Sequence, residues 1–182
     1  MWWILVSASL LAAQAVPPAP SRWVTDTANF ISPAAATALD ARLQAYQQET
    51  GHQLLVYIGN TTGGVPIEDF AVRAFEAWRV GRQGIDDGLV LFIMSDDRRL
   101  RIEVGYGLEG QVPDAIASRV INEVIVPRIQ AGDPDGAVTA GIDAVVSVIS
   151  GQGLGAFGGG GGEPTESVTG SPATSNTPRS RL

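Results

Sequence analysis

Residues 88–110 read GLVLFIMSDDRRLRIEVGYGLEG and decide the fold of this chain. Leu89–Met94 is a continuous apolar run, which is typical of a strand covered on both faces. Arg99–Val104 alternates instead, with apolar side chains on one face and charged ones on the other, as in a half-exposed strand near a sheet edge. The loop between the two runs is short. The stretch therefore predicts an antiparallel hairpin.

The glycines that follow this hairpin match a nucleotide-binding motif by spacing alone. Gly105, Gly107 and Gly110 spell G-x-G-x-x-G. In a dinucleotide site a helix begins inside the motif, so that its N-terminus meets the pyrophosphate. Here the next helix begins only at Pro113, and Glu109 inside the loop would repel phosphate. We expect no nucleotide cofactor, and we expect the glycines to let the backbone approach a neighbouring segment closely.

The elements around the hairpin predict the fold class. Proline is favoured in the first turn of a helix, where its missing N–H costs nothing. Four prolines therefore predict helix starts, namely Pro33, Pro66, Pro113 and Pro134. Gln53–Ile58 is another continuous apolar run and predicts a buried strand. Because the strands predicted at Gln53–Ile58 and Leu89–Met94 flank a helix, they should be parallel and joined by a right-handed crossover. The prediction is an α/β fold in which a mixed β-sheet is sandwiched between helices.

The composition excludes several classes of function. The chain carries a net charge of −7, and this charge falls on the folded part. An acidic domain does not suit nucleic acid, which selects for a positive surface. Cysteine is absent, which removes disulfides, cysteine nucleophiles and thiolate metal sites.

The two ends differ in character from the middle. Residues 1–15 are predicted to be a signal peptide cleaved after Ala15, with an uncleaved membrane anchor as the alternative. Residues 16–21 are predicted to be a linker and 22–150 the domain. Residues 151–182 are rich in Gly, Ser, Thr and Pro, and are predicted to be disordered. We expect an exported protein, periplasmic or extracellular, with membrane association through the N-terminal segment if that segment is retained.

Several carboxylates are expected to converge on one end of the sheet. Asp86 and Asp87 precede the first hairpin strand and Glu109 follows the second, so antiparallel pairing places them side by side. Asp114 opens the next helix. Asp26 is a weaker candidate. It lies six residues before the cap of the first predicted helix, and an extended segment of that length spans ~20 Å, which is enough to cross the sheet and reach the other acids. Carboxylates and loop carbonyls are ligands that Ca²⁺ or Mg²⁺ prefers, and like charges so close need neutralising.

Each of these acids also has an ordinary structural interpretation. Asp87 before Gly88 is common turn chemistry. Asp114 favours a helix N-terminus, and Glu109 can be solvated. Asp26 can cap a local turn. The sequence leaves both interpretations open.

The sequence resembles a known family, the TPM domain, also called the TPM phosphatase domain. The resemblance covers about residues 23–150, and the matching stretches are WVTDTANFIS (23–32), TGHQLLVYI (50–58), IEDFAVRAFEAWRVG (67–81), IDDGLVLFIMSDDRRLRIEVGYGLEG (85–110) and PDAIASRVINEVIVPRIQAGD (113–133). Ile129 replaces the usual aromatic residue, a departure that concerns packing more than chemistry. The resemblance implies an α/β sandwich, export, and a divalent-cation site in some members.

Two functions follow from the resemblance and the acids together. One is a metal-dependent phosphatase in which Asp87 binds Mg²⁺ or Ca²⁺ and Asp86 or Glu109 acts as base. Against this function, the chain has no cysteine that could act as a nucleophile, and His52 is its only histidine. The other is a cation-binding accessory module for an envelope or membrane protein complex. We favour the module, because binding needs only the carboxylates. No catalytic residue is assigned.

Overall fold

The computed structural model describes residues 16–155, and it confirms the predicted α/β class. The predicted signal peptide and residues 156–182 of the predicted disordered tail lie outside the described residues. The sheet has four strands in the order β1-β2-β3-β4, namely β1 (Val24–Asp26), β2 (Gln53–Gly59), β3 (Gly88–Met94) and β4 (Arg99–Val104). The first three strands are parallel, and β4 pairs antiparallel with β3, as the hairpin predicted.

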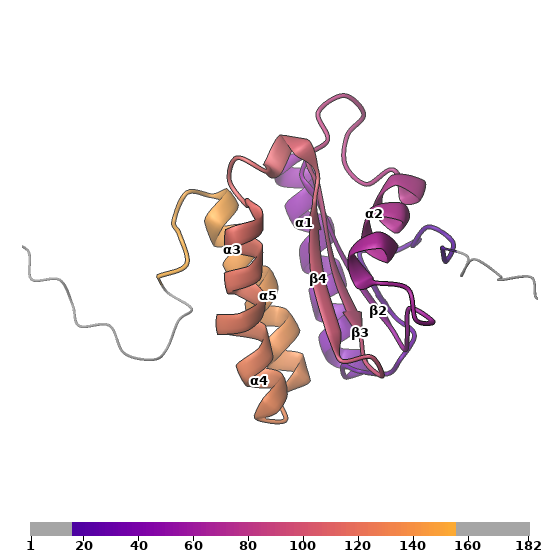
Figure 1. The fold of residues 1–182 in the computed structure, drawn as a ribbon. Coiled ribbons are helices and arrows are strands. Elements are labelled where there is room, and N and C mark those ends of the chain that lie inside the picture. Colours follow the sequence, from indigo (N-terminus) through magenta and orange to yellow (C-terminus); the bar gives the residue numbers. More distant parts are fainter. Residues whose placement is uncertain (1–15, 156–182) are drawn as a thin grey trace, which may run out of the picture.

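Helices cover both faces of this sheet (Figure 1). The helices are α1 (Pro33–Thr50), α2 (Ile67–Trp78), α3 (Asp114–Arg119), α4 (Val126–Gln130) and α5 (Pro134–Ile149). One apolar core lies between the sheet and the layer of α1, α3, α4 and α5, and a second lies between the sheet and α2. Every residue of β3 is buried, which explains its continuous apolar run.

Strand β1 was not predicted. It has only three residues, and Val24 pairs with Val56 at the outer edge of β2. A strand this short shows no alternation that a sequence pattern can detect. Asp40 on α1 supports it, since its Oδ1 accepts a hydrogen bond from the Val24 backbone N at 2.9 Å.

The helix expected to begin at Pro113 is divided. Between α3 and α4 the chain forms a π-helical stretch, Val120–Ile125. Pro127, in the first turn of α4, cannot donate a backbone hydrogen bond, so the regular α-helical pattern is interrupted in the turn before it. Helix α5 packs closely on this stretch, and a β-carbon added at Gly141 would lie 2.6 Å from the Ile125 side chain.

Residues on both sides of the predicted domain, 22–150, contact its two cores. In the predicted linker, the Pro17 carbonyl oxygen accepts a hydrogen bond from Trp78 Nε1 at 2.8 Å, and Val16 packs against the core under α2. In the predicted tail, Leu154 is buried against the other core. None of the described helices is both long and apolar enough to cross a membrane.

Candidate functional site

The two turns that the hairpin brings together meet at one rim of the sheet, as predicted. The Gly105 backbone N donates to the Gly88 carbonyl oxygen at 2.8 Å, and the Gly107 N donates to the Asp86 carbonyl oxygen at 3.0 Å. A β-carbon at Gly105 or Gly107 would collide with the carbonyl oxygen of Asp86 or Ile85, respectively. The glycines therefore allow close contact between two backbones, as expected.

Asp87 is buried beneath this rim, and both of its carboxylate oxygens contact neighbouring polar groups. It is 1% exposed. Its Oδ1 accepts from the Arg82 backbone N at 2.9 Å. Its Oδ2 accepts from Arg82 Nε at 2.8 Å and from Arg82 Nη2, and it lies 3.2 Å from His52 Nδ1. Through these contacts the Asp87 carboxylate links the loop before β3 to His52, which directly precedes β2.

The surroundings of Asp87 keep it ionised. Burial acts to raise its pKa, but the hydrogen bonds and the charge of Arg82 outweigh burial and lower the pKa to about 2. No pattern in the sequence indicated this ion pair, because Arg82 precedes Asp87 in a loop without periodicity. Four residues lie between them, and two of these, Gly84 and Asp86, have the left-handed backbone that turns the loop back on itself.

Asp86 lies apart from Asp87. Its side chain lines an exposed hollow beside Glu76 and Arg79 on the side of α2, while its carbonyl oxygen accepts the bond from Gly107. Adjacent acids therefore have different surroundings.

Glu109 and Asp114 do come together, and the structure adds a third acid. With Glu103 and Arg101 they line a hollow of about 320 Å³ at the end of β4. Arg101 Nε donates to Glu103 Oε2 at 3.1 Å, and Arg101 Nη2 lies 3.8 Å from Asp114 Oδ1. Burial raises the pKa of Glu103, and the charges of Asp114 and Glu109 raise it further, although Arg101 opposes them.

Glu103 was not among the predicted site residues. The alternation of β4 placed it on the charged face and gave no partner for it. The available signal was its position near the end of the strand, two residues before the loop that carries Glu109.

Asp26 lies at the opposite end of the sheet. It pairs with Ile58 near the end of β2, whereas the rim described above adjoins the beginning of β3. Its two carboxylate oxygens accept from the backbone N of Ala28 at 2.9 Å and of Ile31 at 3.0 Å. This is the turn-capping role considered as its alternative. Within residues 16–155, no three His, Asp or Glu side chains are arranged to hold a metal ion.

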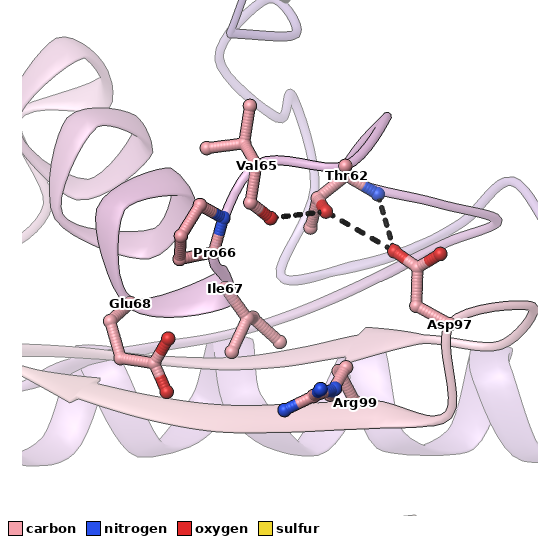
Figure 2. A pocket seen from close by; sticks show the side chains of 8 residues that line it. Thr62, Val65, Pro66, Ile67, Glu68, Asp97 and Arg99 are labelled. Carbon is pink, nitrogen blue, oxygen red and sulfur yellow. Dashed lines mark hydrogen bonds between the residues drawn. The ribbon is translucent and has the colours of Figure 1, made fainter.

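A hollow of mixed charge lies near the other end of the hairpin (Figure 2). Asp97 accepts hydrogen bonds there from the backbone N of Thr62 at 2.7 Å and from the hydroxyls of Thr61 at 2.8 Å and Thr62 at 3.2 Å. Glu68 and Arg99 complete the charged lining. Because Asp97 is used to hold the loop before α2, we assign this hollow a structural role.

Comparison with known proteins agrees with this architecture. A family model described as the TPM domain matches residues 24–148. The N-terminal domain of a P. gingivalis protein, solved by NMR, is 35% identical, with a TM-score of 0.66 over 71% of this chain and 83% of that one.

Two more distant solution structures share the fold. The BA42 protein of Bizionia argentinensis is 15% identical, with a TM-score of 0.59 over 70% of this chain and 86% of that one. The N-terminal domain of the cg2496 protein of Corynebacterium glutamicum is 17% identical, with a TM-score of 0.52 over 86% and 94%. None of the curated proteins matches the chain significantly.

Proposed function

This chain belongs to the TPM domain family, and we propose that it acts as an exported, cation-binding interaction module for an envelope or membrane protein complex. The observation that carries the proposal is one arrangement at the rim. The hollow of Glu103, Glu109 and Asp114 lies at the base of a turn that holds an exposed tyrosine, Tyr106. We call this arrangement the acidic rim.

No three acids of the described residues are arranged to hold a metal ion, but the exposed carboxylates of Glu109 and Asp114 are ligands of the kind that a hard divalent cation prefers. Glu103 is partly buried, while the side chain of Asp114 is 87% exposed. In the part of the chain that the structure describes, Arg101 is the only basic residue lining the hollow, so three carboxylates share one cationic neighbour there. Burial and, to a smaller extent, the charges of Asp114 and Glu109 raise the pKa of Glu103, and a Ca²⁺ or Mg²⁺ ion bound by Glu109 and Asp114 would relieve the second of these effects. Asp86, Asp87 and Asp26 would support the fold instead of binding the ion.

The turn next to these acids and the segment beside it each expose one large hydrophobic side chain. Tyr106 is 81% exposed, and Ile85 on the adjoining segment is 50% exposed. The turn is held rigidly, because Leu108 is fully buried and Gly107 is bonded to the backbone of Asp86. Exposed aromatic residues on rigid supports are common energetic centres of protein interfaces, since little conformational entropy is lost on binding.

No feature of the site favours the phosphatase hypothesis. Asp87, its expected metal ligand, has both oxygens engaged by Arg82 and His52. A catalytic role would need this buried ion pair to open before a metal could bind.

Titration calorimetry of the full chain with Ca²⁺ and Mg²⁺ tests the cation site. We expect the double substitution Glu109→Gln and Asp114→Asn to weaken binding at least about tenfold, because two anionic ligands are lost. Glu49→Gln is the matched control, since Glu49 is exposed on α1, and we expect it to leave binding unchanged. Equal loss in the control, or unchanged binding in the double variant, would contradict the assignment.

A photo-crosslinking amino acid at position 106 tests the interaction surface in intact cells. We expect a discrete crosslinked species from position 106 and none from position 72, because Val72 is an exposed apolar residue on α2, away from the rim. The same species from both positions would show that the contact is not specific to the turn.

A further inference from the structure

An apolar hollow lies at the end of the sheet opposite the acidic rim. It has a volume of about 460 Å³, within the range of small-ligand pockets. It opens between the end of β3, the start of β4, the loop before α1, and α4. Its apolar lining includes Phe30, Leu100, Val126 and Ile129, which are only partly covered by the rest of the described structure.

The charge of this hollow sets it apart from the other hollows described above. Among the described residues, Arg98 is the only charged one that lines it, whereas each of the other hollows contains at least two carboxylates. Within residues 16–155, the Arg98 side chain makes no ion pair or hydrogen bond, and the polar residues that line the hollow with it are Ser95 and Gln130. A guanidinium at the edge of an apolar surface favours an anionic group attached to an apolar body.

We propose that this hollow binds a free aliphatic carboxylate, with the alkyl chain over Leu100 and Ile129 and the carboxylate paired with Arg98. Contact with the chain removes apolar surface of both partners from water, which contributes about 25 cal/mol per Å². The guanidinium supplies two parallel donors that match a carboxylate. The site shares no residue with the acidic rim, so it stands or fails independently of the proposed function.

NMR titration of the ¹⁵N-labelled full chain with octanoate tests the site, with octanol and octyltrimethylammonium as probes of matched chain length. We expect octanoate to shift the amide signals of residues 93–100 and 126–130 in a saturable way. Octanol should bind more weakly at the same place, and the cationic probe more weakly still. No saturable shift, shifts spread over the surface, or equal binding of the cationic probe would overturn the proposal.

Two variants separate the carboxylate contact from the apolar contact. Arg98→Asn removes the guanidinium and introduces a residue that tolerates the positive φ of 52° at this position. We expect this variant to bind octanoate about tenfold more weakly, with little effect on octanol. The neighbouring Arg99→Asn is the control, because Arg99 lines the hollow of Figure 2 instead. Ile129→Trp should fill the hollow and abolish binding of both, with dispersed spectra showing that the variant is folded.

Binding of lipid in place of free carboxylate is an outcome that the same protein can reveal. Vesicles of anionic phospholipid should leave the signals of residues 93–100 unchanged if the ligand is a free carboxylate. Shifts with vesicles but not with octanoate would overturn the proposal, as would equal weakening by Arg98→Asn and Arg99→Asn.

Discussion

Replacement of Gly107 by alanine is expected to lower the free energy of unfolding by about 3 kcal/mol, the upper range for overpacking in a rigid environment. The added methyl group would collide with the Ile85 carbonyl oxygen, so one of two hydrogen-bonded backbones must move. Gly110→Ala is the matched control, because a β-carbon there meets no atom within 4 Å. Its effect should stay within about 0.5 kcal/mol.

Urea denaturation of the full-length variants measures this difference. The result also tests whether contact between the two turns supports the acidic rim, since Gly107→Ala should weaken cation binding as the turn moves away from residues 85–86. If Gly107→Ala and Gly110→Ala were equally stable, the close contact between these backbones would not contribute to folding.

The substitution Asp87→Asn is expected to cost about 2–3 kcal/mol of stability, the usual range for lost hydrogen bonds to a charged group. It replaces a buried carboxylate that accepts from three nitrogen atoms of Arg82 and leaves the guanidinium facing a neutral amide. Asp86→Asn is the control, because Asp86 is exposed and asparagine suits its positive φ of 55°.

Acid denaturation provides a second test of Asp87. Its pKa is about 2 in the fold, below the value of about 4 expected in an unfolded chain. The stabilisation is therefore complete above pH about 4 and is lost as the pH falls toward 2. The difference in stability between the wild type and Asp87→Asn should shrink over that window.

The role of Asp87 as a support for the fold would be contradicted by one combination of results. This is an Asp87→Asn variant that unfolds like the wild type but no longer binds Ca²⁺ or Mg²⁺. Such a protein would show that the carboxylate binds the ion directly.

The buried strands and the hairpin could be predicted because each leaves a continuous or alternating pattern in the sequence. Strand β3 is apolar at every position after Gly88 since both its faces are covered, and β4 alternates since one face is charged. Strand β1 and the π-helical stretch before Pro127 could not be predicted in this way. Both depend on tertiary contacts, the first with β2 and the second with α5.

The candidate site was predictable at the level of segments but not of side chains. Antiparallel pairing required the segments of Asp87 and Glu109 to meet, and they do. Side-chain direction depended on features without a sequence signature. Asp87 turns inward to Arg82, Asp86 turns toward α2, and Glu103 joins the acids from the strand itself.

The most direct test of the central claim is a ¹H–¹⁵N NMR titration of the full chain with Ca²⁺. The acidic rim predicts saturable shifts confined to residues 101–114 and to the adjoining residues 85–86, with the signals of Ala28 and Ile31 around Asp26 unchanged. Saturable shifts centred on Asp26, or no shifts anywhere at millimolar ion, would contradict a cation site at this rim.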